Sequence, residues 1–367
     1  MSVERSGIMP LKLRENCKYG VASPTSMGVR ITPFSGAPAH TSNMYYMQAT
    51  SAESNAVNIS SSLGIKGLVL TNFVKDSPVS YFIKSELRRR NIDYEGPDIP
   101  QGGPWGYRHQ FNIADSGFGT RGPRVHNDRA GEAGRILNAK DFNFDKIFGE
   151  YGVQILHLSG LIGALSPETI RFCTETVIAA KKYGTLISFD LNYRASFWKG
   201  REHDLHAGFT EIAGMTDILI GNEEDYQLCL GIEGPGKGGI ELSAQIDGFM
   251  EMIGRVKKAY PNVSVFGNTL RQVISANEHL WGAITLFGDK WTVIEPRPIR
   301  VLDRIGGGDG FTGGLLYGIL KGMDPERAAQ FGWASGALAT TVLEDYAVPV
   351  DEDMVWSIYQ GNARVVR

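Results

Sequence analysis

An acid set among glycines is the first feature of the sequence that could do chemistry. The stretch DRIGGGDGFTGGLLYGIL, residues 303–320, surrounds Asp309 with glycines, and the apolar residues that follow have the spacing of a helix. Backbone N–H groups at the start of a helix are unpaired and lie at the positive end of its dipole, so they favour an anion such as phosphate. The stretch therefore predicts an anion-binding loop that carries an acid able to act as a base.

The same stretch contains GDGFTG, which has the G-x-G-x-x-G spacing of a dinucleotide site. That site requires a strand after the helix and an acid about twenty residues further on. Here Asp324 and Pro325 are the residue types that begin another helix, which we expect to extend through 326–343. Because helix follows helix, the Rossmann interpretation fails.

A second glycine-rich run, GIEGPGKGG at 231–239, has the G-x-x-x-x-G-K part of a phosphate loop. Gly238 stands where that motif has the Ser or Thr that holds magnesium. We therefore interpret the run as a flexible connector between helices.

Composition and charge argue against several classes of function. The 367 residues, 42% of them hydrophobic, can bury one large core. A net charge of -3 argues against a nucleic-acid or membrane-surface partner. The three cysteines lie far apart in the sequence, which favours a reducing compartment over a disulfide framework. We see no targeting segment and no apolar run of membrane-spanning length, so we expect a cytoplasmic protein.

Strands that alternate with helices must position the chemical groups. From Val153 onward, apolar runs such as VQILHLSG, LISFDLN and VSVFGN alternate with amphipathic helices. This order predicts an α/β fold, a three-layer α/β/α core in which helices cover both faces of a parallel sheet. Ligands bind beyond the carboxyl ends of such strands. Asp190, Asn192 and Asn222 follow strands and are therefore candidate site residues.

Two segments have no helical period and differ from the rest. Residues 25–50 and 100–130 are rich in Gly, Ser, Pro and Tyr and contain short alternating runs. They predict a small antiparallel sheet, a β lid that covers the pocket. The expected division is therefore an N-terminal strand region at 1–24, this lid, and an α/β core at 51–99 and 131–367.

The glycine-rich stretch resembles the signature of the ribokinase-like sugar kinases, also called PfkB carbohydrate kinases. In that family the signature reads about D-T-x-G-A-G-D, and DRIGGGD keeps both acids and most of the glycine. The resemblance implies that Asp309 is the catalytic base and that the amides of Gly306, Gly307 and Gly308 form the anion hole for the phosphoryl group. It also implies that Asp303 lies on the cofactor side.

Further stretches are similar to one branch of that family, the 2-keto-3-deoxygluconate kinases. SFDLNYRASFW keeps D-x-N-x-R, which implies that Asp190, Asn192 and Arg194 bind the acid sugar or the phosphates. NDRAG resembles the branch's lid segment, which implies that Arg129 reaches the substrate, through its carboxylate. Taken alone, each arginine would be interpreted as part of a surface ion pair. A role in the substrate site is favoured because the two arginines occur together in a chain that also has the expected base and anion hole.

The element GNEED is similar to the N-x-x-E motif that lies near magnesium and phosphate in this family. The resemblance implies that Asn222 and Asp225 bind the cofactor and that Asp225, which stands where Glu is usual, is the metal ligand. It also assigns Asn55 and Asp345 to the substrate site.

Some sugar-side positions depart from the family pattern. Thr50 and Ser51 replace two glycines of the family's G-G-A-E-A-N that approach the sugar, whereas Asn55 is kept. Asn127 replaces the aromatic residue that commonly precedes R-A-G. These departures bear on the identity of the sugar more than on the reaction.

The sequence thus predicts an ATP- and Mg²⁺-dependent kinase of a small sugar acid, most simply 2-keto-3-deoxygluconate, phosphorylated at its terminal hydroxyl. The alternatives are another ribokinase-family enzyme, namely a fructokinase, ribokinase or nucleoside kinase, or a sugar-acid sensor that has lost catalysis. The retained Asp309 counts against a sensor, and Arg129 and Arg194 count against a nucleoside kinase. Exposed lid strands would allow a homodimer through the lid.

Overall fold

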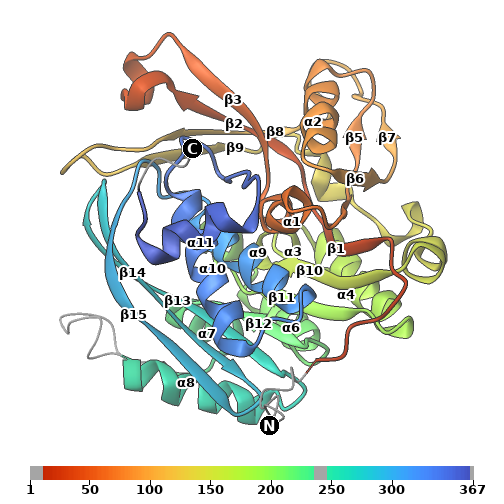
Figure 1. Cartoon of the computed structure of the whole chain (residues 1–367). Coiled ribbons are helices and arrows are strands. Elements are labelled where there is room, and N and C mark those ends of the chain that lie inside the picture. Colours follow the sequence, from red (N-terminus) through yellow and green to blue (C-terminus); the bar gives the residue numbers. More distant parts are fainter. Residues whose placement is uncertain (1–10, 235–245, 364–367) are drawn as a thin grey trace.

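A nine-stranded sheet forms the middle layer of the protein (Figure 1). The computed structural model describes residues 11–234 and 246–363, so most of the predicted connector at 231–239 lies outside the described residues. In spatial order, the strands are β15 (Lys290–Arg300), β14 (Glu278–Phe287), β13 (Val265–Ser275), β12 (Ile218–Ile220), β11 (Leu186–Asp190), β10 (Val153–Ser159), β1 (Tyr19–Pro24), β4 (Gly67–Leu70) and β6 (Ile92–Glu95). Neighbouring strands from β6 to β13 are parallel, as predicted, whereas β13, β14 and β15 pair antiparallel. Strands β14 and β15 were not predicted from the sequence.

Helices cover both faces of this sheet because successive side chains of each strand point to opposite faces. In β12, Leu219 packs into one hydrophobic core, and Ile218 and Ile220 pack into the other. The first core includes α4 (Pro167–Lys182), α6 (Glu202–Ala213), α7 (Glu223–Leu230) and α8 (Ile246–Ala259). The second includes α1 (Ala52–Ser62), α2 (Pro78–Arg89), α9 (Gly307–Leu320), α10 (Pro325–Ala339) and α11 (Glu352–Gln360). The predicted three-layer α/β/α architecture is therefore confirmed.

Helix α10 begins as predicted and ends earlier than predicted. The side chain of Asp324 accepts hydrogen bonds from two backbone N–H groups of the first turn, and Pro325 is the first helical residue. The predicted continuation through 326–343 is wrong, because the helix ends at Ala339. The hydroxyl of Thr340 donates to the carbonyl oxygen of Ala337, and this contact closes the last turn.

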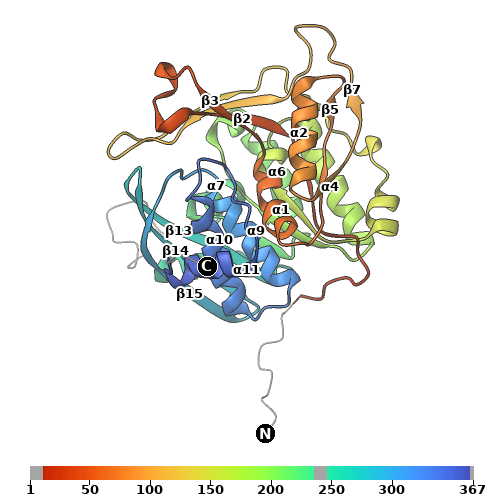
Figure 2. The same ribbon diagram turned by 45° about the horizontal axis from the view of Figure 1, so that its top comes forward.

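A separate four-stranded sheet lies apart from the central sheet (Figures 1 and 2). Its strands are β3 (Tyr45–Thr50), β2 (Gly28–Pro33), β8 (Gln110–Asp115) and β9 (Arg124–Asp128), in that spatial order, and all four fall within 25–50 and 100–130. The prediction of an antiparallel sheet is wrong in one pair, because β2 and β8 run parallel. The chain runs in the same direction through β2 and β8. The sequence did not reveal this, because alternation within a strand indicates which side chains share a face but not which strand lies beside it.

The four-stranded sheet reaches across to the hairpin formed by β13 and β14. Between β8 and β9, the N–H of Gly119 donates to Oδ1 of Asn277 at 2.7 Å, and the N–H of Ala276 donates to the carbonyl oxygen of Gly119 at 2.8 Å. The sheet is thus attached to the core at its far end as well as at its base.

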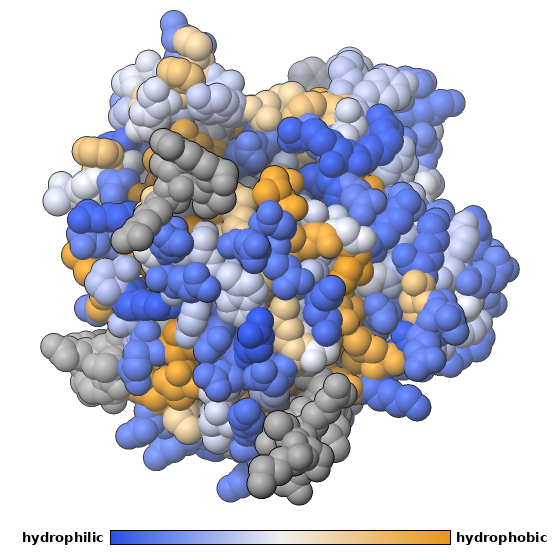
Figure 3. Space-filling model, in the orientation of Figure 1, coloured by the Kyte–Doolittle hydropathy of each residue, from blue (hydrophilic) through white to orange (hydrophobic). Residues whose placement is uncertain are grey.

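The smaller elements include a two-stranded sheet of β5 (Phe73–Val74) and β7 (Asp98–Ile99), and the short helices α3 (Gly160–Gly163) and α5 (Ala195–Trp198). In the view of Figure 3 the surface is mostly hydrophilic, with apolar residues in small patches. Within the described residues, we find no helix that combines the length and the apolar character needed to cross a bilayer.

Candidate active site

A cavity of about 750 Å³ lies between the four-stranded sheet and the carboxyl ends of the parallel strands. Volumes of this size are typical of ligand sites. The cavity brings together most of the predicted site residues, which are Asn55, Arg129, Asp190, Asn192, Arg194, Asn222, Asp225, Gly306, Gly308, Asp309 and Asp345. Two predicted residues, Gly307 and Asp303, do not line it.

The glycine-rich stretch forms the beginning of α9. Gly306 precedes the helix with φ +84°, and a Cβ at this position would collide with the backbone carbonyl of Asp345. Only glycine fits both constraints. The first turn of α9 has no side-chain cap, so its N–H groups are available to an anion.

Asp309 lies in this first turn, and its surroundings favour a bound proton. Burial raises its pKa to about 7, and the charges of Asp345 and Glu53 add to the increase. A hydrogen bond from Nδ2 of Asn55 to Oδ2 of Asp309, at 3.0 Å, and the charge of Arg194 oppose it. A carboxyl group with a pKa near neutrality is suited to accept a proton at physiological pH.

A second acid, Asp190, ends β11 close to Asp309. Burial and the charges of Asp225 and Asp309 hold the pKa of Asp190 well above its usual value. The backbone N–H of Asn192 donates to Asp190 Oδ1 at 3.1 Å, and Asn192 has the left-handed φ of 40°. The clustered carboxylates give this wall of the cavity an excess of negative charge, which suits a cation.

Asn222 and Asp225 begin α7 in a reciprocal cap. Oδ1 of Asn222 accepts the N–H groups of Glu224 and Asp225, and Oδ2 of Asp225 accepts the N–H of Asn222 at 2.9 Å. The other oxygen of Asp225 accepts the N–H of Tyr193 at 2.9 Å. In the described part of the chain no three or more His, Cys, Asp or Glu side chains are grouped to hold a metal ion. Because each carboxylate oxygen of Asp225 already accepts a backbone N–H, a Mg²⁺ ion held here would take most of its ligands from phosphate and water.

The two predicted arginines line the cavity and differ in their contacts. Nη1 of Arg129 donates to Oε1 of Glu132 at 2.7 Å, and the guanidinium lies 5.1 Å from the ring centre of Phe197. Nη1 of Arg194 donates to the carbonyl oxygen of Tyr193 at 2.7 Å. Both bring positive charge to the cavity.

Three further arginines, Arg30, Arg271 and Arg304, also line the cavity and were not among the predicted site residues. A signal for Arg304 was present, because it follows Asp303 at the position where the family signature has Thr. Arg271 lies in β13, in the first strand of the antiparallel edge. Nothing in its local sequence pattern distinguished it from a surface residue.

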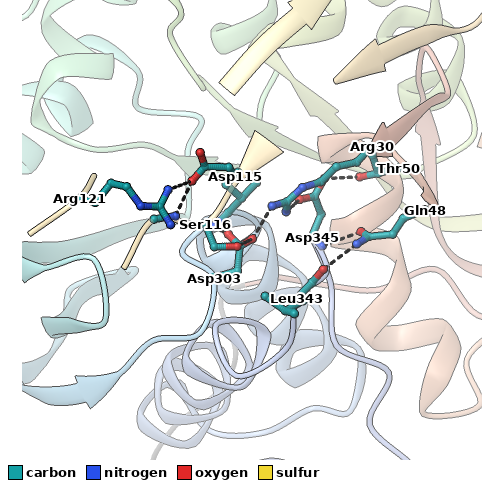
Figure 4. A network of polar contacts seen from close by, with 11 residues as sticks. Arg30, Gln48, Thr50, Asp115, Ser116, Arg121, Asp303, Leu343 and Asp345 are labelled. Atoms are coloured by element: carbon teal, nitrogen blue, oxygen red, sulfur yellow. Dashed lines mark hydrogen bonds and ion pairs between the residues drawn. The ribbon is translucent and has the colours of Figure 1, made fainter. Parts of the chain in front are cut away.

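A buried ion-pair network lies beside the cavity and includes Asp303 (Figure 4). Arg30 in β2 is only 1% exposed, and its two terminal nitrogens pair with Asp303 and with Asp345. Oγ of Ser116, which follows β8, donates to Asp303 Oδ2 at 2.7 Å. Asp303 thus faces Arg30 and the four-stranded sheet. Arg30 was not among the predicted site residues.

A protein-family model and a curated relative both cover most of this chain. The sequence model described as "pfkB family carbohydrate kinase" matches residues 131–351. A 2-dehydro-3-deoxygalactonokinase from Haloferax volcanii is 26% identical over 346 residues, which are 92% of this chain and 96% of the relative.

Solved structures give the same picture. The 2-dehydro-3-deoxygluconokinase from Thermotoga maritima is 25% identical, with a TM-score of 0.84 over 94% of this chain and 98% of that chain. An E. coli protein named for ribokinase II, solved with ATP and Mg²⁺, has a TM-score of 0.73 at 17% identity, over 94% of this chain and 100% of that chain. The latter similarity concerns the fold alone.

Proposed function

Because this chain belongs to the PfkB family of carbohydrate kinases, we propose that it uses ATP to phosphorylate a small sugar acid at its terminal hydroxyl, as a 2-keto-3-deoxygluconate kinase does. The predictions of the family and of a sugar kinase are confirmed. The observation that carries the finer proposal is Asp309, a buried carboxyl with a pKa of about 7 in the uncapped first turn of α9.

The sugar-acid substrate is supported by the names of the relatives and by the charge of the cavity. Relatives from Haloferax volcanii and Thermotoga maritima are named for kinases of 2-dehydro-3-deoxy sugar acids. Arg129 and Arg194 offer the planar groups that bind a carboxylate. Thr50, Ser51 and Asn127, which depart from the family pattern, also line the cavity and are proposed to select among such acids.

In the proposed reaction, the terminal hydroxyl of the sugar gives its proton to Asp309 as its oxygen attacks the γ-phosphorus of ATP. The new O–P bond forms while the bond to the ADP oxygen breaks. The amides of Gly306, Gly307 and Gly308 are proposed to stabilise charge on the transferred group. Mg²⁺, when bound with ATP, would neutralise phosphate charge, and Asp225, with Asn222, is proposed to support that side of the site. Asp303, which the sequence also assigned to the cofactor, is buried and pairs with Arg30, so any effect on the cofactor would be indirect.

A substrate screen tests the proposal. ADP release is measured with ATP, Mg²⁺ and each of a set of sugar acids, neutral sugars and nucleosides. We expect kcat/KM to be highest with a 2-keto-3-deoxy sugar acid. A higher kcat/KM with fructose, ribose or a nucleoside would contradict a sugar-acid substrate and assign the enzyme to that other class of kinase. Binding of a sugar acid without any turnover would indicate a sensor.

Arg129 is expected to read the carboxylate of the substrate. In Arg129→Met, KM for a sugar acid should rise about tenfold or more, because a hydrogen bond to a charged group contributes about 1.5–3 kcal/mol. KM for a neutral sugar should change little. Arg124→Met, which removes an exposed arginine of β9 that does not line the cavity, is the matched control. Equal changes with acid and neutral substrates would contradict the carboxylate role.

We propose that the four-stranded sheet is a lid that excludes water from the phosphoryl group. Its strands bound the cavity through residues such as Arg30, Gln110 and Asn112, and its far turn contacts the β13–β14 hairpin.

The lid is also the proposed contact of a homodimer. β3 and β9 are the edge strands of this sheet, so their outer backbone groups are available for pairing. Tyr45, Tyr46 and Met47 of β3 are exposed apolar side chains.

The free state of Cys17, Cys173 and Cys229 supports the proposal of a cytoplasmic location.

A further inference from the structure

Thr50 connects the lid to the catalytic base through two hydrogen-bonding contacts. It is the last residue of β3, stands where the related signature has glycine, and is 2% exposed. Its Oγ1 lies 2.8 Å from Oδ2 of Asp345 and 3.2 Å from Oδ1 of Asn55. Nδ2 of Asn55 in turn donates to Oδ2 of Asp309 at 3.0 Å. One side chain therefore joins Asp345, which Arg30 holds (Figure 4), to the amide that contacts the base.

The hydroxyl of Thr50 has a single proton and faces two acceptors. A threonine hydroxyl can donate only one hydrogen bond, and hydrogen bonds to ionised carboxylates are the stronger ones. The shorter contact, to Asp345, therefore takes the proton. This leaves Oδ1 of Asn55 facing the lone pairs of Thr50 Oγ1 at 3.2 Å with no proton between them.

Turning the Asn55 amide over removes this conflict. Its Nδ2 then donates to Oγ1 of Thr50, which still donates to Asp345, and its Oδ1 faces Oδ2 of Asp309. That contact is a hydrogen bond only if Asp309 carries a proton. The oxygen and nitrogen of an amide occupy nearly the same positions, so the turn needs no other movement. Each orientation of Asn55 thus matches one protonation state of Asp309.

We propose that Thr50 is a positioning residue that favours the turned orientation of Asn55 and so increases the affinity of Asp309 for a proton. The proposal rests on the proposed role of Asp309 as the base. In that role, Asp309 receives a proton from the sugar hydroxyl, and the turned amide stabilises the protonated carboxyl that results. A glycine at position 50 would leave Asn55 without this hydroxyl.

Other charges also act on Asp309, and they define the comparison that is needed. Asp345 and Glu53 of α1 raise its pKa, whereas Arg194 lowers it, and Asp190 at the end of β11 is close enough for its own pKa to be raised by the charge of Asp309. Thr50→Val leaves all four side chains in place and removes only a hydroxyl of similar volume. A change in the titration of Asp309 is then attributable to the hydroxyl contact.

The direct test is a titration of Asp309 in the protein without substrates. The ¹³C signal of the Asp309 carboxyl is followed against pH and assigned by its loss in Asp309→Asn. In Thr50→Val we expect the midpoint to fall by about half to one pH unit, since a hydrogen bond contributes about 0.5–1.5 kcal/mol and one pKa unit is about 1.4 kcal/mol. The acidic limb of the kcat profile should move by the same amount.

Three variants separate this effect from a structural one. Thr50→Ser keeps the hydroxyl and should keep the midpoint, and Thr50→Ala repeats the test if the valine variant does not fold. Thr32→Val is the matched control, because Thr32 is a buried threonine of β2 whose hydroxyl has no hydrogen-bond partner within the described residues. An unchanged or raised midpoint in folded Thr50→Val or Thr50→Ala would overturn the proposal. Because the titration needs no turnover, it is independent of the test of Asp309 as the base.

Discussion

Asp309→Asn is expected to lower kcat by about 100-fold to 10,000-fold, because general-base catalysis contributes about this much. The amide has the shape of the carboxyl but cannot take the proton of the sugar hydroxyl. ATP should still bind, since the backbone amides that begin α9 are unchanged. The measurements are kcat from ADP release and ATP affinity from calorimetry. A folded variant that keeps more than about a tenth of the wild-type turnover would contradict the assignment.

The dependence of kcat on pH is a second test of Asp309 as the base. A base works only when it is deprotonated, and the pKa of Asp309 is raised to about 7, so wild-type kcat should fall as the pH drops below about 7. The residual activity of Asp309→Asn should lack this limb. Asp353→Asn is the matched control, because Asp353 lies in the first turn of α11 and is exposed. It should leave both kcat and the profile unchanged.

Arg30→Met is expected to lower the free energy of unfolding by about 3–5 kcal/mol, which is typical when one partner of a buried ion pair is removed. The variant leaves two carboxylates, Asp303 and Asp345, without the cation that they share in a site that is almost fully buried. Urea denaturation followed by tryptophan fluorescence measures the change.

An exposed arginine provides the comparison for Arg30. Arg89 pairs with Glu86 on the surface of α2, with 65% of its side chain exposed, so Arg89→Met should cost no more than about 1 kcal/mol. If the two variants lost similar stability, the ion pairs of Arg30 would contribute little beyond a surface contact.

The core of the fold was predictable because its signals are local. The hydrophobic runs of β10, β11 and β13 alternate with amphipathic helices, and Asp324 and Pro325 mark the start of α10. The β2–β8 pair was not predictable in its direction. Both strands alternate, and alternation identifies the buried face of a strand without identifying its neighbour.

The site was predictable where glycine or a helix cap reveals a constraint on the backbone. Asp309 follows this rule, because its glycines and the helix after them are visible in the sequence. Asn222 was a candidate because it follows a strand, and Asp225 came from the family resemblance, whereas the cap that both form at the start of α7 is visible only in the structure. Arg30 and Asp345, by contrast, are 315 positions apart, and no periodicity connects them. Their pairing depends on how the lid strands meet the core, and this is a property of the tertiary structure.

The parallel pairing of β2 with β8 also constrains how the chain folds. Between these strands the chain builds α1, β4, α2 and β6, which belong to the core. The lid therefore cannot assemble as an independent unit, and its central pair closes only after this intervening part has collapsed onto the sheet. Long-range parallel pairing of this kind is slow because the entropy of loop closure is lost before the contacts form. During synthesis on the ribosome, the strand at 28–33 would emerge well before its partner at 110–115. The edge of this strand that later pairs with residues 110–115 would stay unpaired until then.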